Sequence, residues 1–329
     1  MQHKILVIQT AFTGDAILAS ALMESLHAAL PEARLDLLVR KGNENLYSDH
    51  PFLNNLIIWD KENAKWNNLF RLLLSIRKER FDMVINLQRF ASTGLLTAFS
   101  GAKERIGFKK NPFSFLFNRS VKHEIGDGRH EIERNNDLIA HLSNSASKTP
   151  RLYPTEADKK AVIGFMDLPY ICLAPGSVWA TKMWPEERWA ELIQLHLKKY
   201  PDHRIFLLGA PSENNLCERL KLASNSNLVT SLSGKLSLLQ SAELMRNAQM
   251  NYVNDSAPLH LASATNAPVT AIFCSTIPAF GFGPLSKKSK TIEVKNKLEC
   301  RPCGLHGKKS CPLGHFNCGN EITAEEVIQ

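Results

Sequence analysis

Short apolar runs that do not alternate with polar residues restrict the fold of this chain more than any other feature. They are rich in Ile, Leu and Val, as in KILVIQT (4–10), FDMVINLQ (81–88), YICLAPG (170–176) and RIFLLGA (204–210). Helical patterns such as residues 17–30 and 185–200 alternate with these runs. Strands that are buried on both faces of a parallel sheet have this character. The sequence therefore predicts an α/β fold built from βα units.

The alternation of strands and helices occurs twice along the 329 residues. The first array ends near residue 142, the polar stretch 143–160 follows, and the second array begins at YICLAPG. We therefore expect two doubly wound, Rossmann-like domains, residues 1–155 and 156–329. Ligands of such sheets bind beyond the carboxyl ends of the strands, so the loops that follow strands are the candidate sites.

The composition suggests where the protein is located and what kind of partner it binds. No apolar run reaches the ~18 residues of a membrane span, and HKILVIQT is already a strand rather than a leader, so we expect a cytoplasmic protein. The net charge of +8 suggests an acidic partner (nucleic acid, an anionic membrane or a phosphorylated small molecule) or a general solubility charge. The tail EITAEEVIQ begins like a helix and stops abruptly, which would fit a chain truncated at residue 329.

The first strand ends in QTAFTGDAIL (9–18), which places a carboxylate at a strand-to-helix turn. Gly14 would allow a close backbone approach or an unusual φ angle, and Asp15 would project from the first helical turn. Alternatively, Thr13 or Asp15 simply caps the helix. The segment is not a G-x-G-x-x-G fingerprint, which weakens the case for a nicotinamide dehydrogenase.

Two loops of the second half have polar residues suited to a nucleotide. Lys182 follows the strand YICLAPG in a loop that also contains Ser177, and a lysine beside hydroxyls suits a phosphate group. RIFLLGAPSENN places Gly209 after a strand and Glu213 in the next first turn, where Glu213 could accept from ribose hydroxyls. Both charged residues could equally be solvated surface groups.

The loop in MNYVNDSAPLHLASA combines several features of an anion site. Asp255 and Ser256 directly follow a strand, and Ala257 opens a helix with proline in its first turn. The free N–H groups of a helix start bind anions, and His260 lies one turn in. A lone histidine is usually structural, but the combination predicts a nucleotide-diphosphate site.

Four cysteines lie close together near the C-terminus: Cys300, Cys303, Cys311 and Cys318. This spacing could hold a structural Zn²⁺, and reduced or redox-labile thiols are the alternative. The other three cysteines lie in apolar contexts and are expected to be buried.

QTAFTGDAIL, APGSVWATKMWP, LLGAPSE and NDSAPLHLASA, in this order and spacing, resemble the ADP-heptose:lipopolysaccharide heptosyltransferases of glycosyltransferase family nine. CRPCGLHGKKSCPLGHFNC resembles the tail of the heptosyltransferase II-type members. The resemblance implies the GT-B fold, in which two Rossmann-like domains face a central cleft. It also implies inverting transfer of heptose from ADP-L-glycero-D-manno-heptose to the lipid-linked inner core of lipopolysaccharide.

The resemblance also implies roles for individual residues. Asp15 matches the catalytic base, with Thr13 and Gly14 beside it on the acceptor side, and Lys182 matches the lysine that stabilises the ADP leaving group. Glu213 matches the ribose-binding acid, and Asp255, Ser256 and Ala257 match the phosphate loop, in which Ala257 replaces the usual glycine. The chain has no Asp-x-Asp pair, so we expect chemistry that needs no metal or other cofactor.

The basic segment 101–124 interleaves six Lys and Arg residues, among them Lys109 and Lys110, with four phenylalanines. It would suit a phosphorylated glycolipid, with peripheral contact to the inner leaflet of the inner membrane, or it is a strand and a solvated loop. Two other functions stay open: a GT-B transferase that uses another nucleotide sugar, and a basic nucleic-acid-binding protein. The second leaves the strand-end motifs unexplained and lacks an RNA-binding aromatic signature, so we expect no nucleic-acid partner.

Overall fold

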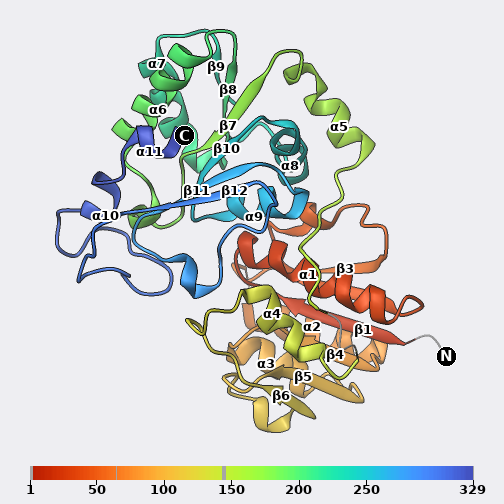
Figure 1. Ribbon diagram of the computed structural model, residues 1–329. Coiled ribbons are helices and arrows are strands. Elements are labelled where there is room, and N and C mark those ends of the chain that lie inside the picture. The colour runs from red at the N-terminus through yellow and green to blue at the C-terminus, as the bar shows by residue number, and fades with distance from the viewer. Residues whose placement is uncertain (1–2, 64, 143–145, 329) are drawn as a thin grey trace. The chain divides into compact units, whose positions relative to one another are not determined.

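The computed structural model describes residues 3–63, 65–142 and 146–328. The chain divides into two compact units, Met1–Tyr153 and Pro154–Gln329, shown together in Figure 1. The division lies two residues before the boundary that the sequence predicts. Residues 143–145 of the polar stretch lie outside the described residues.

In its described residues, the first unit contains one six-stranded parallel sheet in the order β3-β2-β1-β4-β5-β6. Helix α1 packs with α4, and α2 packs with α3. The strand order reverses between β1 and β4, so the carboxyl ends of these strands form the switch point of this sheet. The elements are β1 (Lys4–Gln9), α1 (Thr13–Ala29), β2 (Arg34–Arg40), β3 (Leu53–Trp59), α2 (Lys65–Glu79), β4 (Met83–Asn86), α3 (Ala91–Ala98), β5 (Glu104–Phe108), β6 (Arg119–Val121) and α4 (Glu131–Asn136).

The described part of the second unit contains another six-stranded parallel sheet, in the order β12-β11-β10-β7-β8-β9. Helix α6 packs with α7 and α11, and α8 packs with α5 and α9; Figure 1 shows α6 and α7 on the opposite side of this unit from α5 and α8. The switch point lies between β7 and β10. The elements are α5 (Glu156–Val162), β7 (Tyr170–Ala174), α6 (Glu186–Lys199), β8 (Arg204–Leu207), α7 (Asn214–Ser224), β9 (Val229–Ser231), α8 (Leu238–Asn247), β10 (Asn251–Asn254), α9 (Ala257–Thr265), β11 (Val269–Phe273), β12 (Ser289–Glu293), α10 (Asn317–Asn320) and α11 (Ala324–Ile328).

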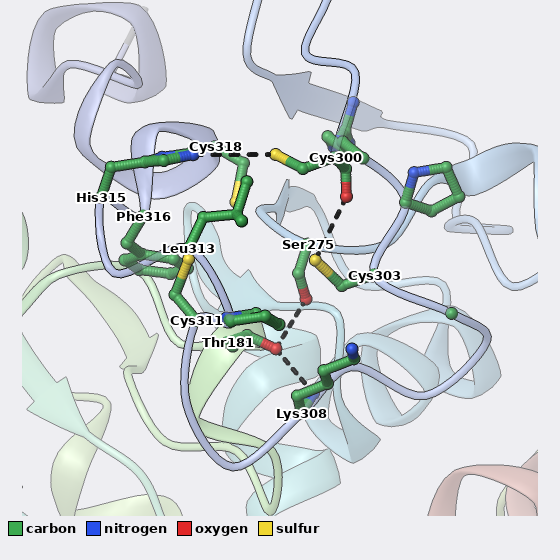
Figure 2. A pocket seen from close by; sticks show the side chains of 14 residues that line it. Thr181, Ser275, Cys300, Cys303, Lys308, Cys311, Leu313, His315, Phe316 and Cys318 are labelled. Atoms are coloured by element: carbon green, nitrogen blue, oxygen red, sulfur yellow. Dashed lines mark hydrogen bonds between the residues drawn. The ribbon is translucent and has the colours of Figure 1, made fainter.

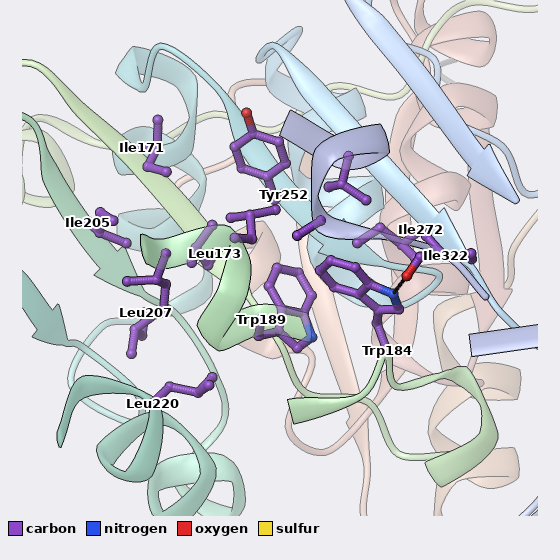
Figure 3. Packing of buried hydrophobic residues seen from close by; sticks show 14 of the residues in the cluster. Ile171, Leu173, Trp184, Trp189, Ile205, Leu207, Leu220, Tyr252, Ile272 and Ile322 are labelled. Atoms are coloured by element: carbon purple, nitrogen blue, oxygen red, sulfur yellow. Dashed lines mark hydrogen bonds between the residues drawn. The ribbon is translucent and has the colours of Figure 1, made fainter. Parts of the chain in front are cut away.

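The end of the chain completes the core of the second unit. Trp184 and Trp189 are buried and meet edge to face, and residues of the tail pack on the same cluster (Figure 3). The indole N–H of Trp184 donates to the carbonyl of Ile322 at 3.2 Å. Glu326 accepts the N–H of Thr323 at 3.1 Å, which stabilises the start of α11. Residues beyond 316 are therefore part of this domain.

The α/β fold class with two Rossmann-like domains is confirmed. The burial of Cys172, Cys217 and Cys274 is also confirmed. The sequence EIERNNDLIAHL (131–142) has a helical pattern, but α4 ends at Asn136 and a 3₁₀ turn, Asp137–Ile139, follows it. Among the described residues, no helix is both long and apolar enough to cross a membrane.

Candidate donor and acceptor sites

The loop after β7 brings Lys182 to the switch point of the second sheet. Lys182 ends a 3₁₀ turn, Ala180–Lys182, and its ammonium lies 2.7 Å from the carboxylate of Asp255. Asp255 follows β10, which is the neighbour of β7 in the sheet although 80 residues of sequence separate the two strands' ends. The strand order therefore creates an ion pair that neither loop predicts alone.

This ion pair is mostly shielded from water. The side chains of Lys182 and Asp255 are 14% and 7% exposed. The hydroxyl of Thr276, in the loop that follows β11, donates to the same carboxylate oxygen at 2.5 Å. An ammonium has three donors, so Lys182 can bind Asp255 and still offer N–H groups to a further anion.

Asn254 and Thr276 are site residues that the sequence reading did not identify. Asn254 is fully buried; its amide donates to the carbonyl of Pro175 at 2.7 Å and accepts the N–H of Trp184 at 3.0 Å. It thus fixes the loop of Lys182 against β10. Asn254 ends β10 and Thr276 lies in the loop after β11, so the rule that identified Asp255 could have found both.

Glu213 lies over the ends of β7 and β8. Its carboxylate accepts the N–H of Ala210 at 2.7 Å. A Cβ on Gly176 would lie 2.1 Å from this carboxyl group, and one on Gly209 would lie 2.9 Å from it. A side chain at either glycine would therefore displace the carboxyl group of Glu213 from this position. Burial raises the pKa of Glu213, while the bond from Ala210 opposes this rise. Ser177 lies half-buried beside Gly176 and accepts the N–H of Trp179 at 3.4 Å.

Helix α9 begins directly after Asp255. Ser256 is its N-cap residue and Ala257 is its first helical residue, so the alanine that replaces the family's glycine has a helical conformation. The first N–H groups of such a helix favour an anion. His260 is buried one turn in, with its ring 6.5 Å from that of Phe282.

In the first unit, Asp15 lies half-buried in the first turn of α1, after β1. The N-cap position is Phe12, so neither Thr13 nor Asp15 occupies it. The hydroxyl of Thr13 instead donates to the amide oxygen of Asn43 at 2.9 Å. Gly14 is helical, so the unusual φ considered for it is not found. The carboxylate lies at the switch point of its own sheet.

The basic segment 101–124 is only partly available to a ligand. Lys103, Arg119 and Lys122 form ion pairs with neighbouring acids. Lys109 and Lys110 are exposed. The four phenylalanines do not form one surface, because Phe108 is buried in β5 while Phe115 is 78% exposed. Lys109, Lys110 and Phe115 are therefore the residues of this segment that we expect to meet a ligand.

The four tail cysteines and His315 line one cavity of about 380 Å³ (Figure 2). The sulfur of Cys300 lies 3.9 Å from Nε2 of His315. Burial raises the pKa of Cys318 to about 11, so it is a neutral thiol at pH 7. Within residues 3–63, 65–142 and 146–328, no three His, Cys, Asp or Glu side chains are arranged to hold a metal ion. The four cysteines are thus neighbours around one cavity, and the four-thiolate zinc site stays a prediction.

Comparison with known proteins identifies the family. The model of glycosyltransferase family 9 (heptosyltransferase) matches residues 69–314. Lipopolysaccharide heptosyltransferase 3 of Escherichia coli is 25% identical over 283 residues, covering 80% of this chain and 82% of that protein. The structure of E. coli ADP-heptose lps heptosyltransferase II superposes with a TM-score of 0.82 at 23% identity, covering 99% and 96% of the two chains. The iron-containing glycosyltransferase TibC from enterotoxigenic E. coli superposes with a TM-score of 0.61 at 16% identity, covering 99% and 77%. Since the family model matches well over half of the chain, this protein is a glycosyltransferase of family 9, the heptosyltransferase family, and has that family's GT-B fold class.

Proposed function

We propose that the protein transfers heptose from ADP-L-glycero-D-manno-heptose to the inner core of lipopolysaccharide, with inversion at the anomeric carbon. The observation that carries the donor half is the Lys182–Asp255 pair beside the start of α9 at the switch point. The family membership and the named activities of the relatives support the choice of sugar and acceptor.

The donor would bind to the second unit. Its diphosphate meets the free N–H groups of Lys182 and the first N–H groups of α9. Glu213 accepts hydrogen bonds from the ribose hydroxyls. As the bond between the anomeric carbon and the diphosphate breaks, its electron pair stays on ADP, and Lys182 stabilises the added negative charge.

The acceptor would be activated by the first unit. Asp15 takes the proton of the acceptor hydroxyl while the oxygen attacks the face of the sugar opposite to the departing ADP, which inverts the configuration. A carboxylate in the first turn of a helix is kept ionised by the helix dipole. This mechanism requires Asp15 and Lys182 to meet across a cleft between the domains, which stays a prediction.

Replacing Asp15 by Asn tests the mechanism. We expect kcat to fall by roughly 10²- to 10⁴-fold, the usual contribution of a general base, with the Kd for ADP unchanged because the proposal assigns Asp15 to the acceptor. The Lys182→Met variant provides the contrasting case, with weaker ADP binding. Parental turnover by the Asp15→Asn enzyme would exclude this residue as the base. Assaying ADP-heptose against other nucleotide sugars, with core acceptors of graded length, identifies the donor and acceptor.

We further propose peripheral contact with an anionic membrane, at helix α2. Trp66, Phe70 and Leu74 recur every fourth residue and are 70%, 66% and 59% exposed. The exposed cations Arg71 and Lys78 lie on the same helix. A row of Trp, Phe and Leu flanked by cations suits the boundary between headgroups and acyl chains. A lipid-linked acceptor would be presented at such a surface.

Catalysis is proposed to need no metal, since the sequence has no Asp-x-Asp pair. A structural zinc ion on Cys300, Cys303, Cys311 and Cys318 stays a separate prediction, for which the thiols would have to move closer together. Elemental analysis of freshly purified protein distinguishes zinc, iron and unmetallated thiols. A metal content near one per chain is expected if the tail is a metal site, and a content near zero excludes it.

A further inference from the structure

The tail passes directly beside the loop that contains Lys182. The N–H of Thr181 donates to the carbonyl of Lys308 at 3.1 Å, and the N–H of Lys308 donates to the hydroxyl of Thr181 at 2.7 Å. The hydroxyl of Ser275, in the loop that follows β11, is 3.0 Å from that of Thr181 (Figure 2). The residue that precedes Lys182 is therefore held from two sides.

Gly307 brings the tail against Lys182 itself. Its φ is +77°, and a Cβ there would lie 3.2 Å from Cγ of Lys182. The same Cβ would lie 3.0 Å from the hydroxyl of Thr181 and 3.3 Å from that of Ser275. Thr181 and Ser275 are 2% and 0% exposed, so neither can easily move away. A Cβ at residue 307 would therefore fit only if these neighbours moved by a few tenths of an ångström.

The tail segment is itself fixed to the sheet. The guanidinium of Arg301 donates to the carbonyls of Cys274 and Thr276, both at 2.6 Å, and to the carboxylate of Glu293 at 2.7 Å. The N–H of Cys303 donates to the carbonyl of Ser275 at 2.8 Å. Thr276 in turn binds Asp255, the partner of Lys182. The tail segment is thus held by residues 274–276, which follow β11, and it contacts Lys182 in turn.

We propose that residues 301–308, here called the tail clamp, position the ammonium of Lys182 for the donor diphosphate. The clamp restricts the stem of the lysine through Gly307 and its backbone through Thr181. Lys182 then holds its place between Asp255 and the diphosphate when the donor enters. This inference rests on the proposed function, because it assumes that Lys182 binds the diphosphate.

Two glycines of the clamp provide a matched pair of variants. Gly304 has the same φ of +77°, but a Cβ there meets no atom within 4 Å. Gly304→Ala and Gly307→Ala therefore introduce the same backbone strain, and only Gly307→Ala presses on Thr181 and Lys182. Isothermal titration with ADP, NMR titration with adenosine, and steady-state kinetics with the donor are measured on both.

We expect ADP to bind roughly tenfold more weakly to Gly307→Ala than to Gly304→Ala, as for the loss of one charge-assisted hydrogen bond. Adenosine, which has no phosphate, should bind both variants alike. Equal ADP affinities would overturn the inference, and so would a parallel loss of ADP and adenosine, which indicates a general defect of the pocket. A parental enzyme that binds no ADP would instead overturn the proposed function.

If Gly307→Ala folds poorly, variants of Thr181 test the same proposal. Thr181→Val removes the hydroxyl that accepts from Lys308, whereas Thr181→Ser retains it. We expect Val to raise the donor KM and lower the affinity for ADP several-fold, and Ser to restore both. The clamp is refuted if Ser and Val behave alike.

Discussion

The ion pair between Lys182 and Asp255 allows a test of the donor site that does not depend on turnover. At 2.7 Å its Coulomb attraction is roughly 6 kcal/mol for an effective dielectric constant of about 20, before desolvation is subtracted. Removing one partner of a fully buried pair costs about 3–5 kcal/mol, since the other charge is left unpaired. Because Lys182 is still 14% exposed, we expect the lower end, about 3 kcal/mol, for Lys182→Met.

The opposite single variant should cost less. In Asp255→Asn the unpaired group is a long lysine that can reach water, so about 1 kcal/mol is expected. The double variant contains neither charge. Its loss of unfolding free energy should be about 2 kcal/mol smaller than the sum of the losses in the two single variants. For a domain of 150–250 residues, a loss of 3 kcal/mol lowers Tm by roughly 6–12 °C.

Scanning calorimetry at pH 7 measures these differences in the transition of the second unit. Lys221→Met serves as the control, since Lys221 pairs with Glu218 at 3.8 Å on the exposed surface of α7 and should contribute less than about 1 kcal/mol. Additive effects within about 0.5 kcal/mol would show that the two charges do not interact in solution, and the argument for a preformed diphosphate site would be refuted.

Three further predictions concern the reaction and its surfaces. Excess EDTA should leave the transfer rate unchanged; a loss that Mg²⁺ or Mn²⁺ restores would contradict metal-independent chemistry. Reversing charge with Lys109→Glu and Lys110→Glu should raise the acceptor KM while the donor KM stays constant, and an equal rise of both would count against an acceptor surface there. Trp66→Ser with Phe70→Ser should reduce co-sedimentation with anionic vesicles severalfold while activity on a lipid-free acceptor persists; unchanged sedimentation would rule out α2 as the contact.

The inner strands of the two sheets could be predicted because they are buried on both faces. KILVIQT and YICLAPG became β1 and β7, the strands beside the two switch points. The edge strand β12, Ser289–Glu293, was missed since its sequence SKTIE is largely polar and its residues are exposed or half-buried. Helix α3 was missed as well, because its eight residues, ASTGLLTA, include a glycine and two threonines.

The candidate site was also predictable only in part. Lys182 and Asp255 were identified because polar residues that follow strands gather at one edge of a sheet. Their contact depends on the neighbouring positions of β7 and β10, which the linear sequence does not state. The contact of Gly307 with Lys182 crosses 125 positions and leaves no local pattern. From the sequence alone, Gly307 is indistinguishable from an ordinary turn glycine.

The placement of Ile322 and Val327 in the core under Trp184 affects the order of events during synthesis. The first unit holds a complete sheet within its own residues and can fold as soon as they leave the ribosome. The second unit lacks part of its interior until residue 327 has emerged. An elongating chain would therefore present a folded first unit well before the core of the second unit is complete.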